Sequence, residues 1–408
     1  MSINPQKARF YATILLNRIT KNKTGFDAEF SQLVRKYNVS PRESAVLYRL
    51  LYKLLTYYHS VKFLASYHGF SPRVNGVIEY LYTRGFNFDL ILDEVKEAAS
   101  TLSPILRISI LYGYPSWFIR ELYGKTSPES LELALKSLNE KKRWLRVNSL
   151  KTSKEEALEC LEKTGVKVKP HPEFNELLLV SDPFIKVGGN ECVKKGLVIP
   201  QDISSYISTM LINVDQGDLV DACSAPGVKL LQIYSLNKPS RIISVDISEK
   251  RLRTLLKIIE YYVGKPYNVI VINADSAKNH YNTNNATIVI DAPCSNSGAI
   301  YSDPAIKLHL SKRSLRKLSL TQRNILENSL TQGKLIYFMT CSIHPSEGEE
   351  VIDHILEKHE NKVTLETSIQ LPGVSKGYSG YKSTSRVYRI QPHEVNGQGF
   401  FIAILRVK

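Results

Sequence analysis

Strand-like apolar runs alternate with helix-length segments from about residue 217 onward. They occupy residues 219–223, 241–247, 269–274, 287–291 and 334–339. Strands separated in this way by helices pair in parallel, and helices then cover both faces of the sheet. The pattern predicts a Rossmann-like α/β domain over residues 200–408, with a ligand site at the carboxyl ends of its strands.

The first 124 residues have the sequence pattern of an all-helical domain. Ser40 and Glu43 form a capping box around Pro41, which predicts a helix that begins there. The leucines that follow recur at the three-and-four spacing of one buried stripe. A further helix is expected to open at Ser103 and to stop at Pro115. We interpret the leucines as core, and this region contains no catalytic constellation.

Residues 125–199 predict a small α+β (RRM-like) unit. A polar helix over about 127–143 precedes strand-like residues 145–148. A second capping box, Ser153 to Glu156, introduces another helix, and residues 177–180 read as a further strand. The lysines of this unit fit phosphate contacts and a solvated face equally well.

Charge and cysteine content limit the classes of partner and compartment. The formal net charge of +15 favours a polyanion such as nucleic acid, although a generally basic surface is the alternative. The apolar stretch 10–16 is too short to span a membrane and lacks a signal-peptide pattern. Five cysteines, an odd number without Cys-x-x-Cys spacing, fit neither a zinc site nor a disulfide framework. We therefore expect a soluble cytoplasmic protein with free thiols and no metal.

Small or acidic residues follow the first four predicted strands. Loop 221–229 carries small residues that let a ligand approach the backbone. Asp246 suits the hydroxyls of a ribose, Asp275 suits an adenine edge, and Asp291 follows the fourth strand. Each Asp alone could equally cap the next helix or turn. Together they favour a cationic, adenosine-containing cofactor such as S-adenosylmethionine.

Two cysteine-bearing loops follow the last two predicted strands. Cys294 lies in the sequence Asp-Ala-Pro-Cys and Cys341 in Thr-Cys-Ser, 47 residues apart (341 − 294). This pairing fits chemistry in which a thiolate attacks a pyrimidine ring. The alternative for Cys341 is an inert buried thiol at a strand end.

These motifs resemble those of the RNA cytosine-5 methyltransferases of the Sun or Fmu (RsmB-like) type. The residues that carry the resemblance are Gln201-Asp202, Ser205, Cys223 to Lys229, Asp246, Arg251, Asp275, Asp291 to Ser295, Gln322, Ile325-Leu326, Thr340-Cys341-Ser342 and Gly399-Phe400-Phe401. The N-terminal helices, with Pro115-Ser116-Trp117 near their end, resemble the NusB-type RNA-binding domain of Fmu-like members.

The resemblance implies a role for each site residue. Cys341 is the expected nucleophile, Cys294 assists release of the product, and Asp291 hydrogen-bonds the base and touches the cofactor. Cys223 is expected to pack, and Lys229 to contact the cofactor or the base. The expected S-adenosylmethionine site comprises Cys223, Ser224, Ala225, Pro226, Gly227, Val228, Lys229, Asp246, Arg251, Asp275 and Asp291. The implied substrate is ribosomal RNA, with transfer RNA open, and we expect a monomer.

Several positions depart from the family pattern. Val228 replaces a glycine in the cofactor loop, where its Cβ is expected to restrict the backbone. Asn296-Ser297-Gly298 replaces a more glycine-rich segment, Thr331-Gln332-Gly333 replaces a proline-glycine-glycine turn, and Glu347-Gly348-Glu349 lacks a central asparagine. Both cysteines and all three carboxylates are present, so we expect an active, divergent enzyme.

Two alternatives come from other classes of protein. DNA cytosine methylation takes its nucleophile from the proline-cysteine loop, and the Thr340-Cys341-Ser342 loop argues against it. A non-catalytic RNA-binding assembly factor would retain the helical domain and basic surface, and Val228 is its main support.

Overall fold

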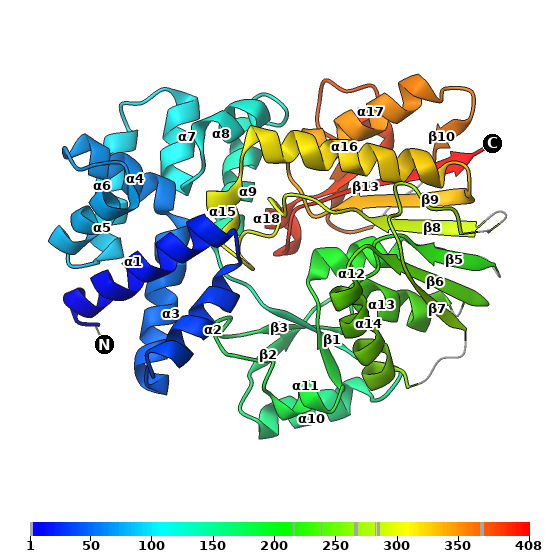
Figure 1. The fold of residues 1–408 in the computed structure, drawn as a ribbon, viewed down its shortest axis with the longest axis horizontal. Coiled ribbons are helices and arrows are strands. Elements are labelled where there is room, and N and C mark those ends of the chain that lie inside the picture. Colours follow the sequence, from blue (N-terminus) through cyan, green and yellow to red (C-terminus); the bar gives the residue numbers. More distant parts are fainter. Residues whose placement is uncertain are drawn as a thin grey trace. The chain divides into compact units, whose positions relative to one another are not determined.

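The structure is a computed structural model that describes residues 3–214, 217–237, 239–264, 268–281, 283, 286–367 and 371–408. The chain forms two compact units (Figure 1). The helical unit comprises residues 1–140 and 299–311, and the sheet unit comprises residues 141–298 and 312–408. None of the described helices is both long and apolar enough to cross a membrane. The domain boundaries expected at 124/125 and 199/200 stay predictions.

The N-terminal region is helical, as predicted from the cap at Ser40 and the leucine stripe. Its helices are α1 (Pro5–Asn22), α2 (Phe26–Lys36), α3 (Pro41–Thr56), α4 (Tyr58–Tyr67), α5 (Val74–Thr83), α6 (Phe88–Ala99), α7 (Pro104–Tyr112), α8 (Ser116–Leu122) and α9 (Pro128–Asn139). The Ser40 side chain accepts a hydrogen bond from the Glu43 N–H at 3.3 Å. Helix α7 ends at Tyr112 and is capped by Gly113 (φ 67°), two residues before the expected stop at Pro115, because glycine adopts the left-handed C-cap conformation without strain. The resemblance to NusB itself stays a prediction.

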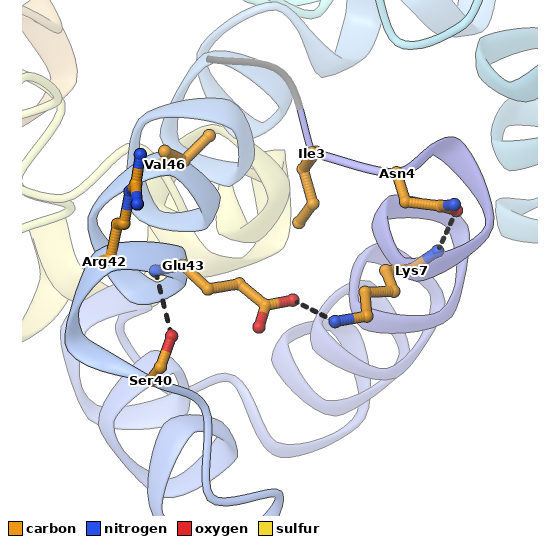
Figure 2. Close-up of a pocket in the computed structure, with 7 residues that line it drawn as sticks. All are labelled: Ile3, Asn4, Lys7, Ser40, Arg42, Glu43 and Val46. Atoms are coloured by element: carbon orange, nitrogen blue, oxygen red, sulfur yellow. Dashed lines mark hydrogen bonds and ion pairs between the residues drawn. The ribbon is translucent and has the colours of Figure 1, made fainter.

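A cavity of about 290 Å³ lies between the start of α1 and the start of α3 (Figure 2). Lys7 Nζ reaches Glu43 Oε1 at 3.0 Å, and Asn4 caps α1. These polar groups satisfy one another, and none of the predicted site residues lies here.

The helical unit also contains the later segment 299–311, which the sequence did not predict. This segment carries α15 (Ile306–His309) and the fully buried Lys307. The Lys307 Nζ atom donates hydrogen bonds to Thr56 O (2.7 Å), Tyr112 O (2.6 Å) and Asn139 Oδ1 (2.6 Å). Burial lowers the pKa of Lys307 well below its usual range. The hydrogen bonds offset part of the cost of burying this amine.

A four-stranded antiparallel sheet with two helices forms the predicted small α+β region. Its elements are β1 (Trp144–Val147), α10 (Lys154–Lys163), β2 (Val168–Pro170), β3 (Leu177–Val180), α11 (Glu191–Lys194) and β4 (Val198–Pro200), in the strand order β2-β3-β1-β4. Ser153 and Glu156 form the expected capping box. Cys160 and Cys192 form a disulfide, so the expectation that all five cysteines are free thiols is wrong for these two.

A nine-stranded sheet forms the core of the sheet unit and confirms the Rossmann-like α/β prediction. The strands are β5 (Asp218–Asp221), β6 (Arg241–Asp246), β7 (Val269–Asn273), β8 (Ala286–Asp291), β9 (Gly333–Thr340), β10 (Val363–Leu365), β11 (Val374–Lys376), β12 (Tyr388–Ile390) and β13 (Phe400–Val407). Strands β7-β6-β5-β8-β9 are parallel in this order, and β13, β12 and β11 extend the β9 edge in antiparallel fashion, with β10 paired to β13. The order reverses between β5 and β8, where ligands bind in such sheets.

Helices cover both faces of this sheet. One face packs against α12 (Ile203–Met210), α13 (Val228–Asn237) and α14 (Glu249–Tyr262), and the other packs against α16 (Lys312–Ser329) and α17 (Glu349–Lys358) (Figure 1). Buried aliphatic side chains fill both layers, which explains the continuous apolar runs in the strands. The loops at the strand ends are therefore held on a rigid, two-sided core.

Candidate active site

The two cysteine loops meet at the carboxyl ends of neighbouring strands. Strands β8 and β9 pair in parallel with Asp291 opposite Met339, so the loops that follow them emerge side by side. The Sγ atoms of Cys294 and Cys341 lie 3.1 Å apart, and both side chains are partly exposed. The structure thus brings together the two thiols that the sequence singled out.

Asn296 completes a polar cluster around these sulfurs. The Cys341 Sγ lies 2.8 Å from Asn296 Oδ1, and the Cys294 Sγ lies 3.7 Å from the same oxygen. Asn296 has a left-handed backbone (φ 56°), a conformation that asparagine tolerates better than most residues. Sequence reasoning noted Asn296 only as a departure from a glycine-rich pattern, because its contact partner lies 45 residues away in the chain.

Glu347 ties the two cysteine loops together. Its buried carboxylate accepts hydrogen bonds from Ser295 N (2.8 Å), Ser295 Oγ (2.5 Å) and Ser342 Oγ (2.7 Å). These serines directly follow Cys294 and Cys341. Gln322 Nε2 on α16 adds a contact at 3.3 Å. Burial raises the pKa of Glu347, although the hydrogen bonds oppose this rise. Sequence reasoning assigned Glu347 no role.

A cavity of about 450 Å³ opens beside the two thiols. It is lined by Ala222, Cys223, Ala225, Pro226, Asp246, Ile247, Arg251, Asp275, Ser276, Asp291, Ala292, Pro293, Cys294, Asn296, Thr321, Ile325 and Cys341. Most of the predicted site residues therefore surround one space. Ser224, Gly227, Val228 and Lys229 do not line it. Ile325 on α16, which was among the motif residues, lines the cavity. Thr321, also on α16, was missed, and only its position next to Gln322 could have indicated it.

The cofactor loop turns sharply before α13 begins. Gly227 has φ 103°, and Val228 is the first residue of α13, packed against the apolar core. The left-handed conformation thus falls on Gly227 rather than on Val228. The expectation that the Val228 Cβ restricts the loop is wrong, because a helical backbone accommodates a Cβ.

Two carboxylates at the cavity already have protein partners. Asp246 accepts hydrogen bonds from the backbone N–H groups of Ser248 (2.9 Å) and Ala225 (3.3 Å). Arg251 lies 3.4 Å from Asp246 and also bonds the Ala225 carbonyl. Asp275 caps the turn at Ala277 (3.0 Å). Asp246 and Asp275 therefore both cap a turn and line the cavity, although the sequence analysis treated these two roles as alternatives.

The charges in the site are coupled. Lys229 Nζ donates to Asp291 Oδ2 at 2.6 Å. Burial lowers the pKa of Lys229, but Asp291 outweighs it and the net shift is upward. Burial raises the pKa of Asp221 to about 7, and the charge of Asp291 adds to this rise. The contact with the Cys341 sulfur, together with burial, raises the pKa of the Cys294 thiol well above its usual range.

The donor set suits S-adenosylmethionine. Three carboxylates, Asp246, Asp275 and Asp291, face one cavity, and a cofactor with sulfonium and ammonium charges complements them. The tight turn at Gly227 keeps the backbone of loop 222–227 close to this space. In the described part of the chain, no group of three or more metal-ligating side chains occurs.

Comparison with known proteins places this arrangement in a family. Residues 208–406 match the family model described as 16S rRNA methyltransferase RsmB/F. Residues 114–187 match the ferredoxin-like domain of RsmF/B-like methyltransferases. The chain belongs to the RsmB/F family. This family consists of S-adenosylmethionine-dependent RNA cytosine-5 methyltransferases, so the resemblance inferred from the sequence motifs is confirmed.

Individual RsmB/F relatives share moderate similarity with this chain. The 25S rRNA (cytosine-C(5))-methyltransferase nop2 of Schizosaccharomyces pombe is 28% identical over 317 residues, covering 73% of this chain and 52% of that protein. Ribosomal RNA small subunit methyltransferase B of Serratia proteamaculans is 27% identical over 308 residues, covering 72% and 66%. The chain thus spans about half to two thirds of the length of these relatives. The crystal structure of PH0851 has the same fold, with a TM-score of 0.76, 22% identity and coverage of 100% of this chain and 99% of that chain.

Proposed function

We propose that this RsmB/F member methylates carbon 5 of a cytosine in ribosomal RNA, with S-adenosylmethionine as methyl donor. The observation that carries the proposal is the pair of sulfurs, 3.1 Å apart, at a cavity lined by three carboxylates. A reaction that needs both a nucleophile and a second proton-handling group accounts for the pair. Ribosomal RNA is favoured because the relatives described above are named for it and because the chain is strongly basic.

The cofactor would be held by residues on the sheet side of the cavity. Asp246 and Arg251 would bind its ribose, and Asp275 its adenine. Asp291 would bind its charged end, with the residues of loop 223–229 that line the cavity, namely Cys223, Ala225 and Pro226. When bound, it supplies an electrophilic methyl group.

Cys341 would start the reaction as nucleophile. Its thiolate adds to carbon 6 of the cytosine, which gives carbon 5 enamine character and lets it accept the methyl group. Asp291 hydrogen-bonds the ring during addition, and its ion pair with Lys229 keeps it oriented. The base must leave its stack to reach the sulfur, so unpaired or locally opened RNA is the expected substrate.

Cys294 would complete the reaction after methyl transfer. Its contact with the Cys341 sulfur is the main cause of its raised pKa. Once Cys341 is bonded to carbon 6, that sulfur carries no charge and the pKa of Cys294 falls. Cys294 can then release its own proton to solvent. Its thiolate accepts the carbon 5 proton, and the electron pair left on carbon 5 expels Cys341 as a thiolate.

We further propose that the enzyme acts as a cytoplasmic monomer on RNA. Both catalytic thiols must stay reduced for the mechanism, which favours a reducing compartment. Transfer RNA is the alternative substrate, since no residue of the site identifies the RNA class.

Bisulfite sequencing of total RNA tests the proposal. The experiment compares cells with the wild-type protein, cells without it and cells with only the Cys341→Ala variant. One or a few ribosomal cytosines should resist bisulfite conversion in the wild-type cells alone. If the protected cytosines lay in transfer RNA instead, the proposed reaction would stand and the proposed substrate would be wrong. No difference in any RNA, together with no binding of S-adenosylmethionine by titration calorimetry, would favour the non-catalytic assembly factor.

A further inference from the structure

Asn296 makes a short hydrogen bond with the Cys341 sulfur. Its Oδ1 lies 2.8 Å from Sγ, and the Cys294 sulfur is the other hydrogen-bonding neighbour of Cys341 among the described residues. We propose that Asn296 is a further catalytic residue, whose carboxamide orients the Cys341 thiol and stabilises it as the thiolate that attacks the base. This inference rests on the proposed function, in which Cys341 is the nucleophile.

A carboxamide can serve both protonation states of the sulfur. The Oδ1 atom accepts a hydrogen bond from the neutral S–H group, which is the contact observed. When the proton leaves, a half-turn about the Cβ–Cγ bond presents the Nδ2 donor to the thiolate. No backbone amide or other side-chain N–H group among the described residues donates to this sulfur. Lys229, paired with Asp291, interacts with Cys341 through its positive charge. Asn296 adds a hydrogen-bond donor at the sulfur itself.

The backbone around Asn296 does not itself require this contact. A glycine would adopt φ 56° at least as easily, and the family pattern has a more glycine-rich sequence here. The loop is fixed just beyond, where Ser297 Oγ meets Ser342 Oγ at 2.9 Å and Gly298 N donates to Cys341 O at 3.0 Å. A Cβ on Gly298 would lie 2.0 Å from Gly399 O, so the backbone segments at these two glycines are in close contact. The two loops thus hold the carboxamide against the sulfur.

The test compares Asn296→Gly with Asn396→Gly in the full-length protein. Asn396 has almost the same backbone conformation (φ 55°), is exposed and does not line the cavity. Both variants remove a carboxamide from a left-handed residue, so they are matched in their effect on folding. The primary readout is the rate of Cys341 alkylation by iodoacetamide as a function of pH, followed by peptide mass spectrometry. This readout needs neither RNA nor cofactor.

We expect Asn296→Gly to raise the midpoint pH of Cys341 alkylation by about one unit, the effect of losing a hydrogen bond to a charged group. Asn296→Asp should raise it further, because a carboxylate repels the thiolate. Single-turnover methylation at neutral pH should fall about 10-fold in Asn296→Gly. Asn396→Gly should match the wild type in both assays.

Equal midpoints for Asn296→Gly and Asn396→Gly would overturn the inference while leaving the proposed function intact. If instead Cys341→Ala retained methyl transfer, the nucleophile assignment would fail. The alkylation profile would still show whether Asn296 controls this sulfur.

Discussion

The protein brings cysteines together in two regions, with different outcomes. Cys160 and Cys192 join α10 to α11 as a disulfide within the four-stranded region, where Cys192 is fully buried among apolar side chains. Cys294 and Cys341 approach to 3.1 Å without a bond, beside a cavity and within reach of Asn296. Proximity alone therefore does not determine what a pair of cysteines does. The open cavity distinguishes the reactive pair from the structural one.

The largest expected effect comes from removing the nucleophile of the reactive pair. Cys341→Ala should lower kcat/KM for RNA methylation by at least about 1000-fold, because the proposal assigns addition at carbon 6 to Cys341 and proton removal to the remaining thiol, Cys294. Methyl transfer from labelled S-adenosylmethionine measures this loss. The double variant Cys160→Ala, Cys192→Ala is the control and should methylate at the wild-type rate. Retention of a tenth or more of the activity in Cys341→Ala would place the chemistry elsewhere.

The next effect concerns the carboxylate that holds the reactive pair in place. Glu347→Ala should reduce kcat by about 10- to 100-fold, because displacing the cysteine loops by about 1 Å costs this much. Glu347→Gln should recover part of the activity through its remaining acceptor. Glu360→Ala, at an exposed carboxylate, should leave kcat unchanged. Equal kcat in the Glu347 and Glu360 variants would remove Glu347 from a positioning role.

The disulfide should affect stability and not catalysis. Replacing Cys160 and Cys192 by serine opens a cross-link across 32 residues and should lower the free energy of unfolding by roughly 2–4 kcal/mol. Urea denaturation of the variant and the wild type measures the difference. The comparison between the two regions would break down if this variant lost methyl transfer while its folded fraction stayed high.

The smallest effect is the pH dependence of folding stability that Asp221, buried at the end of β5, contributes. Its pKa in the folded protein is about 7, above its ordinary value of 3.8, so the folded state binds more protons between these values. Stability contributed by this group is therefore lost as pH rises from about 4 to about 7. Asp221→Asn should raise the melting temperature relative to the wild type more at pH 8 than at pH 5. An equal difference at both pH values would contradict the assignment.

Much of the fold follows from local sequence signals. The caps at Ser40 and Ser153 start helices where their side chains can accept backbone hydrogen bonds, and the apolar runs become the parallel strands. Asp291, Cys294 and Cys341 follow from motifs that lie directly after those strands. The strand bounds differ from the predicted ones by one or two residues at most ends, where local signals are weakest.

Contacts between distant segments could not be predicted in the same way. The bond of Asn296 to Cys341 and those of Glu347 to Ser295 depend on how two loops meet. The disulfide joins residues 32 apart with no diagnostic spacing, and segment 299–311 folds with helices that precede it by more than 150 residues. Each of these depends on tertiary packing, which one sequence does not display.

The most direct measurement is the identity of the cysteine that bonds to RNA. Cys294→Ala should complete methyl transfer but release its product slowly, so a protein–RNA adduct should accumulate and survive denaturing electrophoresis. Mass spectrometry of the digested adduct should find the nucleotide on the peptide that contains Cys341. A nucleotide found on another cysteine, or an adduct that persists in the double variant Cys294→Ala, Cys341→Ala, would contradict the account.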